Sequence, residues 1–415
     1  MLSKLIGHYE QADLLINGVW IKKWLIKQPF VLHISGDGSL IHKILPFDIF
    51  VMDLILMTAQ TILNQQTNPI SNADRQRLSN LLKGLQETDQ FSYTTQLGPV
   101  YGFPVSGKGW NACLELIEGS ILNPTTDRPN ATLDNLDSLV NRVIISASHF
   151  YSIDSITPTD PQKRALDHLI VSAPLEGSLA DIYPKKKYTG EINTSVVYPG
   201  TYLTQTKNMG DGILFVFSYI YNEAPRIPGA ILTHTLSHQF FTIAYIPNDY
   251  SRIEFRVPKT IPKRHLAKAM LGVKNALNNI FDQAQINVSK TSLNFYKAIS
   301  KLHADSTYGR AVHIVYNGTN TGSDVKFTCR TNPAYNAREL EVNDKSNNND
   351  TFECRAIAVR LDTQNASGVV RTEVGLEPNK KQWLDDAICP EFFIENPADT
   401  ASLNGIINHV INESK

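Results

Sequence analysis

Two long stretches of the chain read as successive short β-strands, and they constrain the fold more than any other feature. In the first stretch, apolar runs broken by turn residues lie at 212–221, 230–236, 239–246 and 252–257. In the second, similar runs lie at 311–316, 325–330, 352–361 and 369–376. Strands that follow one another directly favour antiparallel pairing. We therefore expect an α+β protein built of antiparallel β-meanders, sandwich- or barrel-like, interleaved with helical segments.

Alternation within these strands predicts which side chains face a core. In 252–257 the apolar residues are expected inward and Arg252, Glu254 and Arg256 outward. In 325–330 the alternation places Cys329 on an apolar face, whereas Lys326, Thr328 and Arg330 share the other face. A buried thiol behaves as a small hydrophobic group, so we expect Cys329, and likewise Cys354, to be free and to face a core.

Helical periodicity recurs between the strand regions. The expected helices lie at 44–63, 71–85, 110–117, 132–143, 160–170, 262–281, 292–302 and 403–410. Ser71 and Thr132 are expected to cap two of them, and Asp160-Pro161 to start a third. Asn17-Gly18 predicts a hairpin between two short strands near the N-terminus. The segment 91–101 looks strand-like.

The chain has 415 residues, enough for two or three domains. A stretch at 120–131 rich in Ser, Asn, Pro, Thr and Asp marks the first boundary. We expect a mixed N-terminal domain over 1–125, helices followed by a β-rich domain over 126–258, and a helix-plus-sheet domain over 259–415.

Charge and cysteine usage bound the class of protein. The net charge is −1, so no overall field favours nucleic acid or an anionic membrane. The N-terminus lacks the apolar run of a signal peptide, and Asp48 and Asp53 interrupt the most apolar window, so no membrane span is expected. The four cysteines show no C-x-x-C spacing, which leaves zinc unsupported. We expect a cytoplasmic protein with reduced thiols.

The segment 102–109 nearly matches a phosphate-binding loop. It has Gly102, Gly107 and Lys108 at the required spacing, but Gly109 replaces the Ser or Thr that holds Mg²⁺. Pro104 also removes a backbone donor. Gly107 and Lys108 are therefore weak candidates for cofactor binding. We expect a Gly- and Pro-rich surface loop with no catalytic role for Lys108, and no bound cofactor.

Two histidine pairs are candidates for a metal site. A two-residue turn at Asp37-Gly38 would place His33 opposite His42 on neighbouring strands, and His234 and His238 lie four residues apart. The flanks of the second pair read as strands, so its helical metalloprotease geometry is not expected. A metal site needs three or four ligands, so the expectation for both pairs is ordinary sheet or turn histidines.

The expected helix at 262–281 carries a basic face. Its cations, with two from the preceding strand, form the candidate partner-binding set Lys263, Arg264, Lys268, Lys274, Arg252 and Arg256. Such a face meets protein partners or phosphates, or is simply solvated. The remaining acidic, serine and cysteine residues form no recognisable catalytic motif. No catalytic residue is therefore assigned.

These observations favour a non-enzymatic structural or adaptor subunit of a larger cytoplasmic assembly, for example a secretion apparatus or phage-like particle. The partners expected are other protein subunits, in an oligomer or hetero-complex whose contacts cover open sheet edges. Two alternatives stay open: a nucleic-acid-binding component of a mobile-element or defence complex, and a nucleotide-dependent enzyme using the loop at 102–109.

Overall fold

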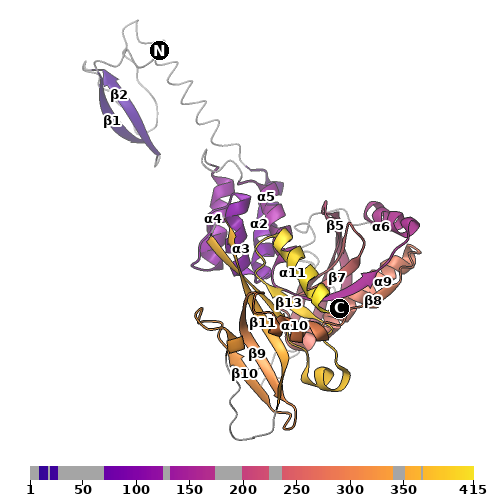
Figure 1. Ribbon diagram of the computed structural model, residues 1–415. Helices are drawn as coiled ribbons and strands as arrows, with labels where there is room; N and C mark the ends of the chain where they lie inside the picture. The colour runs from indigo at the N-terminus through magenta and orange to yellow at the C-terminus, as the bar shows by residue number, and fades with distance from the viewer. Residues whose placement is uncertain are drawn as a thin grey trace, which may run out of the picture. The chain divides into compact units, whose positions relative to one another are not determined.

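A computed structural model describes residues 9–16, 19–26, 70–124, 131–172, 199–223, 236–339, 351–365 and 368–415. The chain divides into two compact units, Met1–Pro69 and Ile70–Lys415 (Figure 1). The helix expected at 44–63 and the histidines His33 and His42 lie outside the described residues.

The first unit contains a β-hairpin. Strand β1 (Tyr9–Ile16) pairs antiparallel with β2 (Val19–Ile26), and Ile16 lies opposite Val19. Two residues therefore connect the strands, which confirms the hairpin predicted from Asn17-Gly18.

The second unit begins with a layer of helices. Their bounds are α2 Asn72–Glu87, α3 Phe91–Leu97, η2 Gly98–Tyr101, α4 Trp110–Leu122 and α5 Leu133–Ser146. The side chains of Ser71 and Thr132 accept hydrogen bonds from backbone N–H groups three residues ahead, which confirms both predicted caps.

The strand expected at 91–101 was wrong, because these residues form α3 and η2. Tyr93, Thr94 and Leu97 are buried against the other helices, and their spacing of three to four residues fits one face of a helix. Tertiary packing therefore overrides the strand preference of the aromatic residues here.

One antiparallel sheet of 11 strands organises the rest of the second unit. The strands are β3 His149–Ile156, β4 Gly200–Asn208, β5 Gly212–Glu223, β6 Leu236–Pro247, β7 Arg252–Pro258, β8 Lys290–Ser292, β9 Arg310–Gly318, β10 Asp324–Thr328, β11 Phe352–Asn365, β12 Gly368–Leu376 and β13 Phe392–Glu395. Their order is β10-β9-β11-β12-β13-β3-β7-β6-β5-β4, with β8 also paired to β3. The α+β class is confirmed, with the strands in one continuous sheet.

Strand β3 joins the two halves of this sheet. It pairs with β7 along one side, and with β13 and β8 at the two ends of its other side. The boundary expected near residue 258 therefore falls inside a region whose strands are connected through β3.

The remaining helices cover the sheet. Their bounds are α6 Asp160–Ser172, α9 Lys263–Gln283, α10 Tyr296–Ala304, η3 Ala337–Glu339, η4 Gln382–Asp386 and α11 Thr400–Glu413. The apolar stripe predicted for the 262–281 helix is buried as expected at Leu266, Met270, Val273 and Leu277.

Helices cover one face of the sheet along its whole length, and we call it the first face. Residues of α2–α5 pack against Val216 and Ile243, and residues of α10 and α11 pack against Ile357 and Phe392. Figure 1 shows α10 and α11 against the strands of the C-terminal half. Cys329 lies in the core beneath these two helices as a free thiol, as predicted, and Cys354 packs at its margin.

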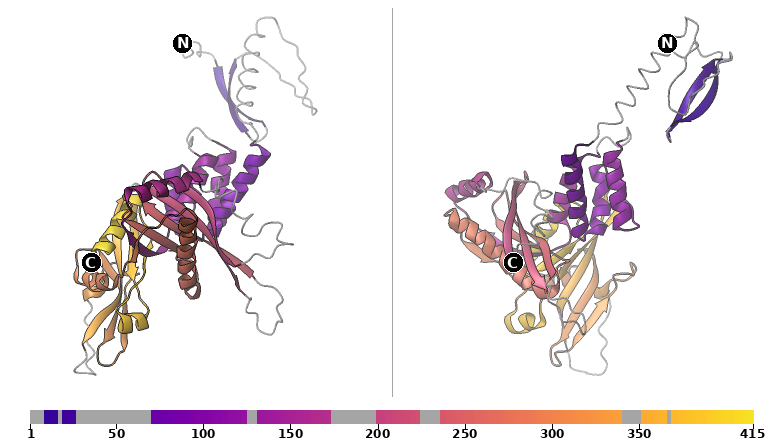
Figure 2. Two further views of the ribbon diagram at one scale, coloured as in Figure 1. Left: turned by 90° about the vertical axis from the view of Figure 1, so that its right-hand side faces the viewer. Right: turned by 180° about the vertical axis from the view of Figure 1, so that it is seen from behind.

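The opposite, second face is covered differently in its two halves. Helix α9 packs on Phe215, Phe217 and Phe255. Over β9–β13, the apolar cluster on the second face consists of strand residues alone among the described residues. Figure 2, right, shows these strands from the side opposite to Figure 1. The second face thus carries a helix on one half and polar side chains on the other.

The charged residues of β7 point into the protein, not outward as expected. Glu254 is fully buried and accepts from Arg252 Nε at 2.8 Å and from Arg256 Nη2 at 2.7 Å. Arg256 also donates to the carbonyl of Ile145 at 2.9 Å. Helices cover both faces of this strand. Its alternating side chains therefore face two different buried environments, and neither set faces solvent.

A substitution at Gly375 in β12 would test how tightly the second face is packed. A Cβ atom there would lie 2.2 Å from the ring of Phe393, its register partner in β13. We expect Gly375→Ala to destabilise the fold by about 1–3 kcal/mol through overpacking. Gly405→Ala in α11 is the control, because its Cβ meets nothing within 4 Å and helix propensity predicts a gain of about 1 kcal/mol. Urea unfolding measures both changes; equal effects of the two substitutions would contradict the packing described.

The buried imidazole of His149 should make the stability of the fold depend on pH. Burial lowers its pKa from the usual 6.5 to about 4, and Nδ1 lies 2.7 Å from the carbonyl oxygen of Ala147. Protonation therefore favours the unfolded chain: this contribution is complete above pH 6.5 and is lost as pH falls toward 4, by about 3 kcal/mol in total. The free energy of unfolding should be measured between pH 4 and 8. Below pH 6.5 it should fall less steeply for His149→Gln than for the wild type, and above pH 6.5 the two curves should run parallel. Parallel curves throughout would exclude this role.

Candidate anion-binding site

Four arginines come together on the second face over β9–β12. Arg310 begins β9 and lies directly opposite Arg360 of β11, and Arg371 of β12 lies opposite Asp362. Arg330 follows the end of β10. Residues opposite one another in an antiparallel register point to the same face, so the strand pairing itself brings these side chains together.

The four arginines line a pocket of about 330 Å³. Thr331, Pro333 and Asp362 contribute to its wall. The volume is at the lower end of that of ligand pockets in proteins. We call Arg310, Arg330, Arg360 and Arg371 the arginine site.

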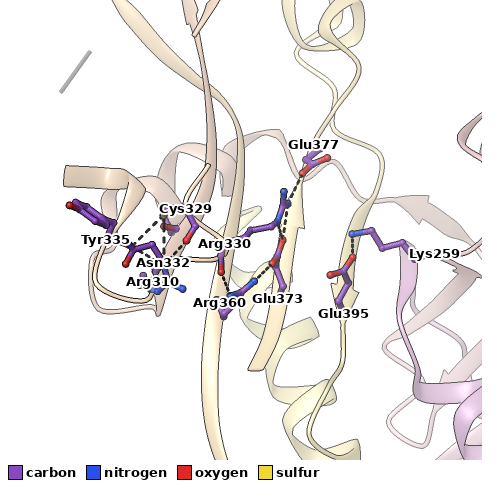
Figure 3. A network of polar contacts seen from close by, with 11 residues as sticks. Lys259, Arg310, Cys329, Arg330, Asn332, Tyr335, Arg360, Glu373, Glu377 and Glu395 are labelled. Atoms are coloured by element: carbon purple, nitrogen blue, oxygen red, sulfur yellow. Dashed lines mark hydrogen bonds and ion pairs between the residues drawn. The ribbon is translucent and has the colours of Figure 1, made fainter. Parts of the chain in front are cut away.

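Glu373 holds two of the arginines in place (Figure 3). One carboxylate oxygen accepts from Arg330 at 2.8 Å and the other from Arg360 at 3.0 Å. The Glu373 side chain is only 5% exposed, and Glu377 lies 3.7 Å from Arg330. These two guanidinium groups are therefore fixed by a carboxylate at the base of the site and are partly neutralised.

Arg310 is held in a different way. Its Nη1 donates to the backbone carbonyls of Cys329, Asn332 and Tyr335 at 3.2, 3.0 and 2.8 Å. Among the described residues no carboxylate lies within ion-pair distance of Arg310 or of the exposed Arg371. Carbonyl dipoles orient the Arg310 guanidinium without cancelling its charge. Arg310 and Arg371 therefore remain as cations for a ligand, and Asp362, opposite Arg371 in the pocket wall, reduces the local positive charge.

The cationic character extends toward the edge strand β10. Lys326 is exposed on the polar face of this strand, and His313 of β9 lies opposite Thr328 with Nδ1 and Oγ1 2.8 Å apart. Burial lowers the pKa of His313, which therefore stays neutral at pH 7. We call Lys326 together with the arginine site the cationic band.

A separate ion pair lies on the same face, nearer the centre of the sheet. Lys259, which follows β7, forms an ion pair with Glu395 of β13, and its Nζ lies 3.3 Å from the ring centroid of Phe393 (Figure 3). Lys259 is thus neutralised and does not belong to the cationic band.

The loop at 102–109 does not have the surroundings of a phosphate cradle. The segment before it is η2, whereas a phosphate-binding loop follows a β-strand. Gly107 and Lys108 are exposed, and the backbone N–H of Lys108 donates to Ser106 Oγ at 3.2 Å. One backbone donor that a phosphate cradle would need is therefore used within the loop.

The candidate partner-binding set does not form one surface. Arg252 and Arg256 are buried on the first face, whereas α9 packs on the second. Lys274 lies 3.1 Å from Asp154, and Arg264 forms an ion pair with Glu223. Lys263 and Lys268 are exposed, and their contact with a partner stays a prediction.

The histidine pairs provide no assembled metal site in the described chain. His234 lies outside the described residues, as do His33 and His42, and His238 stacks on Tyr221 at a centroid distance of 5.0 Å. In the parts of the chain that the structure describes, no group of three His, Cys, Asp or Glu side chains is placed to hold a metal ion.

Sequence reasoning did not find the arginine site. It placed Lys326 and Arg330 on one polar strand face. It did not connect them with Arg310 of the preceding strand or with Arg360 and Arg371 of the two following strands. An arginine at a polar position in each of several neighbouring strands was the available signal. Strand order is needed to join these positions, and periodicity does not supply it.

Comparisons of the chain with models of known protein families, with curated proteins and with solved structures find no match. Within the described segments, no helix has both the length and the apolar composition that a membrane crossing requires.

Glu373 should limit the anion affinity of the arginine site while stabilising the fold. We expect Glu373→Gln to cost about 1.5–3 kcal/mol of stability, because charge-assisted hydrogen bonds to two arginines are weakened. The same change removes a negative charge beside the pocket and should tighten pyrophosphate binding. Glu377→Gln is the control: Glu377 lies 3.7 Å from Arg330, and its loss should cost less than about 1 kcal/mol. Urea unfolding and calorimetric titration measure both effects; weaker pyrophosphate binding by a folded Glu373→Gln variant would refute this role.

Proposed function

We propose that this protein is a non-enzymatic binding subunit of a larger assembly, and that the arginine site holds an anionic group of its partner. The single observation that carries the proposal is the pocket lined by four arginines, two of which have no carboxylate partner among the described residues.

The chemistry of the pocket supports binding over catalysis. A guanidinium group presents a planar fork of N–H donors that matches phosphate or carboxylate oxygens in pairs. It keeps its proton at any physiological pH, so it orients an anion but does not transfer protons. Three of the four arginines are also positioned by other protein groups, which favours recognition of a fixed geometry.

The shape of the sheet supports an assembly role. In the described chain, β10 and β4 are the end strands of the sheet order, so each has one side without a strand partner. Such edges are open to contact with another chain. The arginine site lies on the strands next to β10, so one partner can contact the edge and the site together. We include a hetero-complex or oligomer in the proposal for this reason.

A cytoplasmic location is part of the same proposal. Cys113, Cys329, Cys354 and Cys389 are all free thiols. Burial raises the pKa of the Cys354 and Cys389 thiols to about 12, so both stay protonated and unreactive. Free thiols are the usual state in a reducing compartment.

Pyrophosphate is a suitable probe of the arginine site. We expect it to bind the full chain at low salt, and Arg371→Ala to weaken binding roughly tenfold, because one charge-assisted hydrogen bond is lost. Arg371 is exposed, so the substitution should leave the fold intact. Arg164→Ala is the matched control, since Arg164 is an exposed arginine on α6. Calorimetric titration measures the affinities. No pyrophosphate binding, or binding that neither Arg371→Ala nor Arg310→Ala changes, would reject the proposed function.

A further inference from the structure

The cationic band is longer than one anionic group. Lys326, Arg310, Arg360 and Arg371 lie on four neighbouring strands in the order β10-β9-β11-β12. Arg310 and Arg360 lie directly opposite one another, whereas Lys326 lies opposite Val315, further along β9 than Arg310. At about 3.3 Å per residue, this offset extends the band roughly 16 Å along the strands. A single phosphate or carboxylate contacts one or two of these groups. The band therefore suits a chain that carries several anionic groups in succession.

The surface that carries the band suits a single strand better than a duplex. The arginines line a pocket in a sheet face, and the apolar cluster beside it contains strand residues alone among those described. Duplex DNA is commonly read by a helix or ribbon that projects into a groove. A recessed cationic surface instead tracks one sugar-phosphate backbone, as in proteins that bind single strands.

The loop that holds Arg310 carries an exposed aromatic ring, which points away from the arginines in Figure 3. Tyr335 is 54% exposed, and its carbonyl oxygen accepts a hydrogen bond from Arg310 at 2.8 Å. Figure 3 shows its ring on the outer side of the loop that holds Arg310. Bases stack on such rings beside the groove that holds their phosphates. An acidic peptide could form ion pairs with the arginines, but it carries no base to stack on the ring.

We propose that the anionic partner is single-stranded nucleic acid, whose successive phosphates contact the cationic band while a base stacks on Tyr335. This inference rests on the proposed function, because it names the partner of the same arginine site. DNA and RNA share the required phosphates and bases, so both are probes in the test.

The test is fluorescence anisotropy of the full chain with labelled 12-nucleotide oligo(dT) and oligo(U), between 50 and 200 mM salt. With three to four phosphate contacts, the slope of log affinity against log salt should be about −2 to −3. Arg371→Ala should make this slope smaller by about 0.7, the amount for one contact to a single strand. Arg164→Ala should leave slope and affinity unchanged.

Tyr335 provides a readout that does not depend on charge. Tyr335→Ala should weaken oligonucleotide binding roughly fivefold or more without changing the salt slope, and Tyr335→Phe should restore it, because the ring is retained. Neither substitution should change pyrophosphate binding. Loss of pyrophosphate binding in Tyr335→Ala would show that the ring only supports the loop, and would overturn the stacking role.

Two results separate this inference from the proposed function. Oligonucleotides that bind no more tightly than pyrophosphate, or no more tightly than poly-glutamate, would overturn the inference while leaving an anion-binding site. If pyrophosphate also fails to bind the wild-type chain, the proposed function itself fails. Oligonucleotide binding that Arg371→Ala and Tyr335→Ala both weaken as described supports the inference.

Discussion

The pairing of β3 on both of its sides is the constraint on which the second unit depends. Its hydrogen bonds to β7 and to β13 place strands from before and after α9 in one sheet. An antiparallel register fixes which residues share a face. Val257, Phe150 and Phe393 are therefore successive neighbours on the second face, and the surface under α9 continues to the arginine site. The register of β3 with β7 and β13 therefore places the arginine site on the same face of the sheet as α9.

The protein uses the same arrangement of charges twice, in different surroundings. Glu254 holds Arg252 and Arg256, and Glu373 holds Arg330 and Arg360, so each group of three carries a net positive charge. The first group is buried, where a carbonyl and the rings of Tyr151 and Tyr245, at 5.5 and 4.9 Å from Arg256 Cζ, surround the excess charge. Such buried charges persist only when they are paired and hydrogen-bonded. The second group lies at a pocket, where Glu377 offsets its excess charge at 3.7 Å from Arg330, and Arg310 and Arg371 supply the cations for a ligand.

Much of the secondary structure was predictable because local signals specify it. Caps at Ser71 and Thr132, the apolar stripe of α9 and the strands β7, β9, β11 and β12 all follow from periodicity and turn chemistry. Strand β3 was missed because Ser152, Asp154 and Ser155 interrupt its apolar pattern. Those residues are acceptable there because neighbours satisfy them: Asp154 accepts from Lys274 and Ser292. The burial of Arg252 and Arg256, which alternation had placed outward, needed the order of strands, as did the arginine site itself. No local pattern contains that order.

The three carbonyls around Arg310 have a consequence for how a ligand is received. A free arginine side chain has about 2 kcal/mol of rotamer entropy to lose when it is immobilised. At Arg310 that loss has already occurred on folding, because the loop from Cys329 to Tyr335 fixes the guanidinium through its backbone. Preorganisation of this kind lowers the cost of binding. Since backbone atoms do the fixing, substitutions at Asn332 or Tyr335 can alter the outer surface of the loop while the position of the cation stays the same.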